Sequence, residues 1–215
     1  NIMMKLDIIS DVACPWCYVG KGYLDRALEA NPDHPFEIEW HPFQLDPTIP
    51  KGGIDRADYL LGKFGTHQRV VEIHKPLLEH AEKAGVTLDL AAMKKAVNTL
   101  DAHRLIHWAG LEGRQTPMVS ALFRAYWAER QDIGDAEVLA RLAGAVGLDE
   151  GIVARLLASD ADIDAITARI RHSQNRGVNS VPTFIFANTH ALMGAQPVEM
   201  WARVIEDIRN GGLGG

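Results

Sequence analysis

The chain has 215 residues, of which 47% are hydrophobic and 23% charged, which is enough to bury a substantial core in a globular protein. Its formal net charge of -6 argues against a polyanionic partner, because nucleic-acid binding surfaces are clusters of Lys and Arg. The apolar run at residues 8–9 is far too short for a signal-peptide core or a membrane span. We therefore expect a cytoplasmic protein whose partners include no nucleic acid and no membrane.

The N-terminal segment predicts a strand, a helix and a second strand. Residues 5–10 form a short run rich in aliphatic side chains, which is typical of a buried strand. Apolar residues then recur at helical spacing from Pro15 until Asn31, where a following proline ends the pattern. Residues 36–40 alternate between apolar and polar side chains, so we expect a second strand with one buried face.

A long helical block is expected after this unit, because apolar residues between positions 54 and 176 follow a period of about 3.6. The predicted helices cover residues 56–64, 66–84, 90–97, 101–111, 116–129, 135–146, 149–157 and 160–176. Pro76 should kink or break the second of these helices. The tryptophans expected to pack in the core rather than to bind substrate are Trp40, Trp108, Trp127 and Trp201.

Strand patterns return near the end of the chain. Residues 183–186 and 191–193, separated by a turn at Asn188, predict two short strands. An amphipathic helix is expected from Val198 to Ile208. The order of predicted elements is therefore β-α-β, a long helical block, and β-β-α.

The two cysteines of the chain, Cys14 and Cys17, lie within one window of four residues. A disulfide that closes so short a loop stabilises a fold by only about 2 kcal/mol, so a structural role is a poor explanation. Their spacing at the start of a helix places both sulfurs on one face, where they can form a disulfide. The helix N-terminus favours a thiolate at Cys14, which makes Cys14 the attacking sulfur and Cys17 the resolving one.

Metal binding is the first alternative for a Cys-x-x-Cys pair. Structural zinc requires four ligands, and the sequence has no second cysteine pair to supply them. His103 and His107 share one face of a predicted helix but lack the Glu of the zinc-protease motif, so solvated or capping roles are expected for them. We therefore predict no metal site.

Three segments resemble those of a known family. They are residues 10–18 (SDVACPWCY), 98–104 (NTLDAHR) and 194–197 (GAQP). Together with residues 180–183 (SVPT) and the order of elements, they resemble the DsbA-like branch of the thioredoxin superfamily, and more narrowly its FrnE-like subgroup. The likeness covers nearly the whole chain.

The resemblance implies an α/β protein with a thioredoxin-like fold (β-α-β … β-β-α) and a large all-helical insertion. Residues 4–53 and 177–215 would form the thioredoxin-like domain, and residues 54–176 a helical insertion domain that caps the active site. The resemblance also implies a cis peptide bond between Val181 and Pro182 beside the cysteines, with the Val181 backbone free to pair with substrate.

The motifs and the resemblance together predict the site. The expected catalytic residues are Cys14, Cys17 and Pro182. The expected substrate-binding residues are Pro15, Trp16, Val181, Asn98 and His103. For Asn98 and His103, packing and capping are equally good interpretations. The turn at Gly194, Ala195 and Gln196 could hold a glutathione carboxylate at a helix start, although a simple turn is slightly favoured.

We interpret the chain as a thiol-disulfide oxidoreductase or isomerase that acts through a mixed disulfide. Its partners would be protein or small thiols and disulfides, with glutathione or a thioredoxin-type reductant, and its dithiol would need no cofactor beyond glutathione as a co-substrate. Pro15 and Trp16 carry no ionisable group that would stabilise the thiolate and Asp11 opposes it, so we expect a reduction potential less oxidising than that of periplasmic DsbA proteins.

Two other classes of function remain open. One is a glutathione-dependent isomerase or transferase of the hydroxychromene carboxylate isomerase or kappa type, although those relatives carry Ser at the position of Cys14. The other is a chaperone-like binding protein whose thiols matter little. The sequence leaves open the physiological substrate, the net direction of exchange and the oligomeric state.

Overall fold

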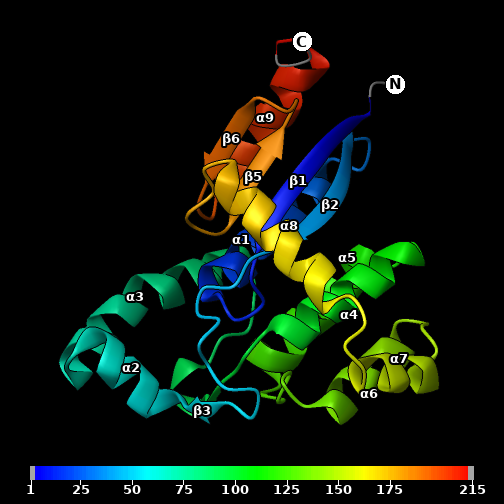
Figure 1. Cartoon of the computed structure of the whole chain (residues 1–215). Coiled ribbons are helices and arrows are strands. Elements are labelled where there is room, and N and C mark those ends of the chain that lie inside the picture. The colour runs from blue at the N-terminus through cyan, green and yellow to red at the C-terminus, as the bar shows by residue number, and fades with distance from the viewer. Residues whose placement is uncertain (1–2, 213–215) are drawn as a thin grey trace.

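The structure is a computed structural model that describes residues 3–212, and it is built on a four-stranded mixed sheet (Figure 1). The strands, in their order across the sheet, are β2 (Phe36–Pro42), β1 (Met4–Ser10), β5 (Thr183–Phe186) and β6 (His190–Met193). Strand β1 pairs parallel with β2 and antiparallel with β5, and β5 pairs antiparallel with β6. The predicted α/β order of β-α-β, helices and β-β-α is confirmed.

Helices follow β1, fill the interval between β2 and β5, and end the chain. They are α1 (Pro15–Ala30), α2 (Arg56–Phe64), α3 (His67–Ala84), α4 (Leu100–Leu111), α5 (Gln115–Phe123), α6 (Ala136–Ala145), α7 (Glu150–Leu157), α8 (Ile163–Asn175) and α9 (Val198–Arg209). None of the helices within residues 3–212 is long and apolar enough to cross a membrane. The domain boundaries proposed from the sequence stay a prediction, and residues 213–215 of the second segment lie outside the described part of the chain.

Strand β1 is buried on both faces because it carries aliphatic side chains on both. On one face lies α9, whose Trp201 packs edge-on against Phe36 and Phe184 with ring centroids 6.1 and 4.9 Å away. On the other face, Ile9 and Ile185 form a second apolar cluster, and α8 crosses this side of the sheet (Figure 1). The C-terminal end of β1 is therefore held between two packed layers where it leads into α1.

One predicted helix is wrong. Residues 90–97 form a 3₁₀-helix, Leu90–Ala92, and then a short strand, β4 (Lys95–Ala96), which pairs antiparallel with β3 (Ile54–Asp55). The apolar spacing indicated burial correctly, since Leu90 and Val97 are buried. The backbone conformation depends instead on hydrogen bonds to β3, a partner about 40 residues earlier in the chain.

Two other differences concern the helical block. Helix α3 continues through Pro76, where a kink or a break was expected, so the helix does not break there. Pro76 is exposed, and water can solvate the carbonyl group that it leaves without a donor. The predicted helix at residues 116–129 ends instead in a π-helical turn, Arg124–Ala128. Such turns are rare and frequently occur at functional sites.

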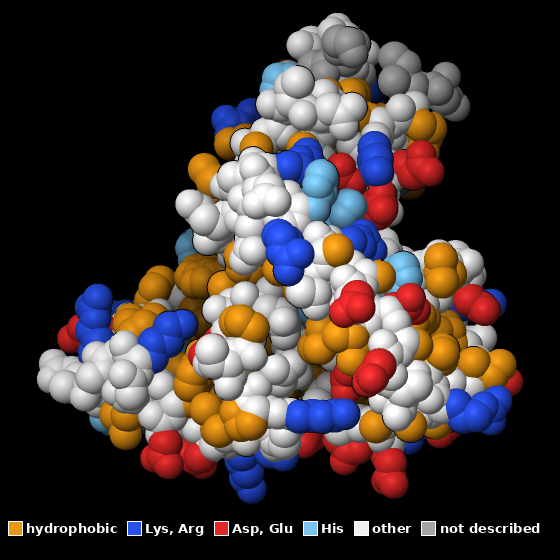
Figure 2. Space-filling model, viewed as in Figure 1, with side chains coloured by type: hydrophobic (Ala, Val, Ile, Leu, Met, Phe, Trp, Pro, Cys, Tyr) orange, Lys and Arg blue, Asp and Glu red, His pale blue; other side chains and the backbone are white. Residues whose placement is uncertain are grey.

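The surface of the helical part exposes more large hydrophobic side chains than the sheet does. Figure 2 shows these side chains in the lower half of the molecule, among Lys, Arg, Asp and Glu side chains of both signs. The most exposed of them on α2, α3, α4 and α7 are Leu61, Val71, Leu78, Leu111 and Ile152.

Helices α1 and α3 approach each other so closely that Gly22 has no room for a side chain. A Cβ atom there would lie 2.6 Å from Cγ1 of Val86 and 3.2 Å from Cβ of Ala84. We expect Gly22→Ala to lower the free energy of unfolding by about 1–3 kcal/mol, because overpacking outweighs the better helix propensity of Ala.

Urea denaturation of wild type and variant measures this loss. Gly62→Ala in α2 is the matched control, since a Cβ there meets nothing within 4 Å, and it should raise stability slightly. A Gly22→Ala variant as stable as Gly62→Ala would contradict the close approach of α1 and α3.

Candidate active site

The turn between β1 and α1 places Cys14 at the start of the helix. Cys14 is the N-cap residue of α1, and its carbonyl oxygen accepts a hydrogen bond from the Tyr18 amide at 3.2 Å. Its own amide donates to the Asp11 carbonyl at 3.0 Å, which closes the turn. Pro15 occupies the first helical position, where its missing N–H group costs no hydrogen bond. Cys14 therefore lies at the N-terminal end of α1, which carries the partial positive charge of the helix dipole.

Cys17 lies one helical turn further on and is more deeply buried. Both cysteines are free thiols, and Cys17 is only 2% exposed. Burial raises the pKa of the Cys17 thiol well above its usual value, and the neighbouring Cys14 raises it further. Cys17 therefore stays protonated at neutral pH.

The loop before β5 brings Val181 and Pro182 to the cysteines. The peptide bond between them is cis, and the Val181 carbonyl oxygen lies 3.8 Å from the Cys14 sulfur, which donates to it. Pro182 packs against α1, where a Cβ atom on Gly20 would lie 3.3 Å from its ring. Among residues 3–212, no hydrogen bond involves the Val181 amide. The cis bond beside the cysteines, which the resemblance implied, is present.

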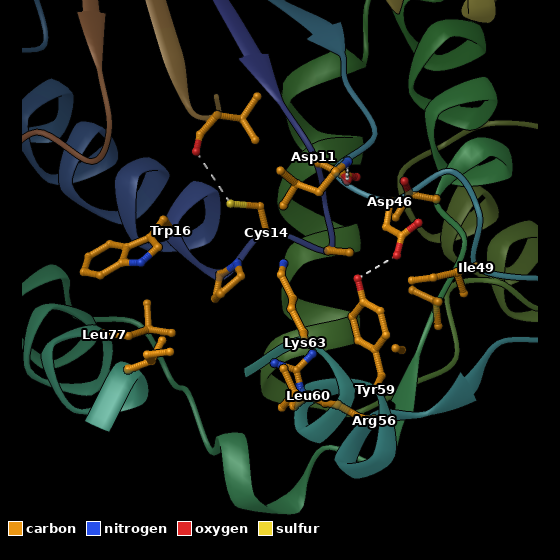
Figure 3. A pocket seen from close by; sticks show the side chains of 18 of the residues that line it. Asp11, Cys14, Trp16, Asp46, Ile49, Arg56, Tyr59, Leu60, Lys63 and Leu77 are labelled. Carbon is orange, nitrogen blue, oxygen red and sulfur yellow. Dashed lines mark hydrogen bonds between the residues drawn. The ribbon is translucent and has the colours of Figure 1, made fainter. Parts of the chain in front are cut away.

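A cavity of about 390 Å³ opens onto Cys14 (Figure 3). Of the predicted site residues, Cys14, Pro15, Trp16 and Val181 line it. The opposite wall comes from α2, α3 and the π-helical turn, so the helical block covers the sulfur. The remaining predicted residues lie outside the lining, with Cys17 in the core behind Cys14.

Helix α2 and the loop after β2 add polar groups to the cavity wall that the sequence analysis did not single out. The Tyr59 hydroxyl donates to Asp46 at 2.8 Å, and burial together with this carboxylate raises the pKa of Tyr59 to about 12. Arg56 and Lys63 line the same wall. Arg56 and Lys63 are seven residues apart, a spacing that puts two cations on one face of a helix. This spacing is the feature of the sequence by which they could have been singled out.

The π-helical turn holds the loop that precedes Cys14. The indole N–H of Trp127 donates to the Val12 carbonyl at 2.8 Å, and its ring stacks on Tyr18. Tyr18 is buried and its hydroxyl donates to the Thr87 carbonyl, so it is a core residue. The packing role predicted for the tryptophans is confirmed by their exposures of 5% or less. The buried tryptophans are Trp40, Trp108, Trp127 and Trp201.

Asn98 and His103 support the loops around the cavity and do not line it. His103 is buried, and its Nε2 lies 2.8 Å from the Phe43 carbonyl oxygen and 3.2 Å from Oδ1 of Asp11, so this nitrogen donates. The solvated role expected for His103 is wrong. Asn98 precedes Thr99, the N-cap residue of α4, and its side-chain oxygen accepts from the Leu100 amide at 2.9 Å. A direct contact of either residue with substrate stays a prediction.

The predicted glutathione contact at residues 194–196 lies in the turn before α9, outside the lining of the Cys14 cavity. The Gln196 side-chain amide donates to the Met193 carbonyl at 3.0 Å, and Ala195 packs against Gly20 of α1. Gly194 has a φ of +85°, a conformation that few other residues adopt. The turn is thus well ordered by its own contacts, and glutathione binding there stays a prediction.

Asp7, Glu39 and His41 on β1 and β2 form a separate cluster whose oxygen and nitrogen atoms lie within 4.8 Å of one another. Lys5 lies 2.6 Å from Glu39, and Arg169 lies 3.1 Å from Nδ1 of His41. Lys5 and Arg169 thus join the three residues in a network of ion pairs and hydrogen bonds on the sheet.

This network should make stability depend on pH. Burial lowers the pKa of His41 below its usual value, although the hydrogen bond to Asp7 acts in the opposite direction. A lowered pKa in the folded state means that the unfolded chain binds more protons, so this contribution is present above the unfolded-state pKa of about 6.5 and is lost as the pH falls through the folded-state value. We expect the wild type to lose more stability than His41→Gln between about pH 7.5 and about pH 5.5. Urea denaturation at both pH values measures this, and equal losses would contradict it.

The chain belongs to the DSBA-like thioredoxin domain family, whose profile matches residues 5–206. Members of this family are disulfide oxidoreductases. A probable DsbA oxidoreductase from Streptomyces coelicolor is 31% identical, and its crystal structure superposes with a TM-score of 0.86 over 96% of this chain and 90% of that one. An uncharacterized protein of Bacillus subtilis, YwbO, is 27% identical over 205 residues, covering 95% of this chain and 96% of its own.

More distant structures share the fold alone. A 2-hydroxychromene-2-carboxylate isomerase is 18% identical with a TM-score of 0.73, covering 98% of this chain and 99% of that one. The cytosolic disulfide reductase DsbM from Pseudomonas aeruginosa, also solved with glutathione, is 21% identical with a TM-score of 0.67, covering 96% and 98%. The predicted thioredoxin-like fold of the DsbA type is confirmed.

Proposed function

We propose that the protein is a thiol-disulfide oxidoreductase in which Cys14 is the nucleophile and Cys17 the resolving thiol. The observation that carries this proposal is the asymmetry of the pair. Cys14 caps α1 and lines the cavity beside the Val181 carbonyl, whereas Cys17 is buried behind it with a raised pKa. Of the two sulfurs, only that of Cys14 lies where a substrate in the cavity can reach it.

In the reducing direction, the Cys14 thiolate attacks one sulfur of a substrate disulfide and displaces the other as a thiolate. The resulting mixed disulfide is opened when Cys17 loses its proton and attacks the Cys14 sulfur. The second substrate thiolate leaves, and the two electrons of the dithiol have passed to the substrate. The oxidising direction is the reverse of these steps.

Neighbouring residues hold the substrate during exchange. The Val181 backbone has an unpaired amide among the described residues and can pair with an extended substrate segment. Pro182 positions Val181 by packing against α1. Pro15 and Trp16 complete the rim of the cavity, and Trp16 is braced edge-on by His80 at 5.4 Å.

We place the protein in the FrnE-like subgroup and in the cytoplasm, with protein or small thiols and disulfides as substrates. The similarity to a cytosolic disulfide reductase that was solved with glutathione supports this setting. Glutathione would then restore the dithiol, and the exchange needs no other cofactor. Isomerisation of protein disulfides would follow from the same chemistry when the mixed disulfide is attacked by a second substrate thiol.

The experiment compares reduction of insulin disulfides with glutathione-dependent isomerisation of hydroxychromene carboxylate. Because Cys14 stands where resembling isomerases carry Ser, we expect insulin reduction and no isomerisation. Cys14→Ser should remove the insulin activity, which a chaperone-like role would leave intact. Insulin reduction at the uncatalysed rate, together with isomerisation, would overturn the proposal.

A further inference from the structure

Arg56 is a buried cation without a counter-ion on the wall of the Cys14 cavity. The residue is only 7% exposed, and its guanidinium lies over the Trp127 ring at 5.2 Å. Among residues 3–212, the ion pairs that arginines form do not include Arg56, and its Nε has no hydrogen-bond partner. A buried guanidinium with free donors is costly unless a ligand supplies acceptors. Arg56 therefore keeps a hydrogen-bond donor on the cavity wall that no side chain of the described residues takes up.

The other charged groups on the cavity wall are Lys63, Asp46 and Asp11. Lys63, two turns along α2, extends toward the sulfur end of the cavity (Figure 3) and has no carboxylate partner among the described residues. Neither carboxylate forms an ion pair with Arg56 or Lys63 among the described residues. Asp46 accepts instead from the Tyr59 hydroxyl at 2.8 Å, and Asp11 from the Leu45 amide at 2.9 Å. Both cations are therefore available to a ligand.

We propose that this cavity takes small disulfides and thiols that carry a carboxylate, with Arg56 as the main carboxylate receptor and Lys63 as the second. The inference rests on the proposed function and names its substrate class. A volume of about 390 Å³ suits a small molecule. The planar guanidinium can bind a carboxylate through two parallel hydrogen bonds. Apolar Leu60 and Leu77 line the same cavity and can cover the stem of the ligand.

The reaction of the reduced protein with such a disulfide is balanced without a further reactant. The Cys14 thiolate displaces one small thiolate, and Cys17 then displaces the second and gives up its proton to solvent. The products are two small thiols and the Cys14–Cys17 disulfide. A single turnover can therefore be measured with the protein and one small disulfide alone.

The test oxidises the reduced protein with 3,3′-dithiodipropionate, which carries carboxylates, with neutral 2-hydroxyethyl disulfide, and with cationic cystamine. Acid-quenched samples are analysed by mass spectrometry. Each rate constant is divided by the rate constant for the reaction of the same disulfide with free dithiothreitol. This ratio corrects for the different intrinsic reactivities of the three disulfides. We expect the normalised constant for dithiodipropionate to exceed the other two by about ten- to a hundredfold. Equal constants, all above background, would overturn the inference and leave the proposed function standing, whereas no reaction with any disulfide would overturn both.

Variants test the assignment of the receptor. Arg56→Met should lower the preference for dithiodipropionate over 2-hydroxyethyl disulfide by about tenfold, and Arg56→Lys should keep part of it. Arg171→Met, on the exposed side of α8, is the matched control for the change in charge and should keep the full preference. A full preference in Arg56→Met would overturn the assignment of Arg56. If Arg56→Met does not fold, Arg56→Lys and Lys63→Met are compared with the wild type instead. A full preference for dithiodipropionate in both variants would then overturn the assignment of the receptor.

Discussion

Cys17→Ser is expected to accumulate a mixed disulfide on Cys14 that the wild type resolves. In the wild type, Cys17 lies one helical turn from Cys14 in the same core and attacks the mixed disulfide as soon as it loses its proton. A serine hydroxyl does not ionise near neutral pH and cannot displace the substrate sulfur. After treatment with oxidised glutathione, mass spectrometry should find one glutathione on most of the variant and almost none on the wild type.

Cys14→Ser is the matched variant, because it also replaces a cysteine sulfur by an oxygen, at the other cysteine of the pair. It leaves the buried Cys17, whose raised pKa keeps it protonated, so the protein should form no adduct and reduce insulin at the uncatalysed rate. Equal rates of adduct formation in the two variants would contradict the asymmetry of the two cysteines.

The largest loss of stability is expected for Arg104→Met. Arg104 is 1% exposed on α4, and its N–H groups donate to the carbonyls of Leu156, Ser159 and Ala161 at 2.8, 2.7 and 2.9 Å. It also donates to Asp101 at 2.9 Å. Methionine would remove all four hydrogen bonds of a buried guanidinium and leave Asp101 and three part-buried carbonyls without these donors, so the free energy of unfolding should fall by about 3–5 kcal/mol.

Urea denaturation measures this loss of stability, and two further variants serve as comparisons. Arg104→Lys should lose most of the same stability, because one ammonium cannot reach acceptors that a planar guanidinium reaches together. Arg171→Met removes the same type of side chain from an exposed position and should change stability by less than about 0.5 kcal/mol. A loss below about 1 kcal/mol in Arg104→Met would contradict the role of Arg104 in joining α4 to the loop between α7 and α8.

Arg104 also shows how a motif can carry a structural role close to a site. Residues 98–104 carry part of the family resemblance, and Asn98 and His103 among them were expected to bind substrate. In the structure Thr99 lines the cavity, while Arg104 points to the loop between α7 and α8. Side chains on one short helix segment point in different directions. Which of them lines the cavity and which stabilises the fold is decided by the elements that pack against each one, and the sequence does not show these.

The core of the site was predictable because its signals are local. A strand that runs into a Cys-x-x-Cys helix start marks Cys14 and Cys17 from one short segment of sequence, and the family resemblance implied that Val181 lies beside them. Strand β1 pairs antiparallel with β5, so the end of β1 and the start of β5 lie side by side. This pairing brings the segment with the cysteines next to the segment with Val181. Their meeting follows from the order of elements.

The far wall of the cavity could not be predicted, because it depends on contacts between distant parts of the chain. Arg56 begins a helix whose position is set by the pairing of β3 with β4, where a helix was expected. The π-helical turn that carries Trp127 has no distinctive apolar spacing. The periodicity of the helical block indicated which residues are buried, but not that Arg56 and Lys63 would line the same cavity as Cys14.

The central claim is that Cys14 and Cys17 form one dithiol-disulfide couple, and an equilibrium titration against glutathione redox buffers tests it most directly. Mass spectrometry of the acid-quenched protein should show a single transition in which the protein loses two hydrogen atoms, with a midpoint more negative than the roughly -120 mV of periplasmic DsbA. Neither single-cysteine variant should show this transition. Protein that stays a dithiol throughout, or that ends with glutathione on Cys14 and no disulfide within the chain, would contradict the claim.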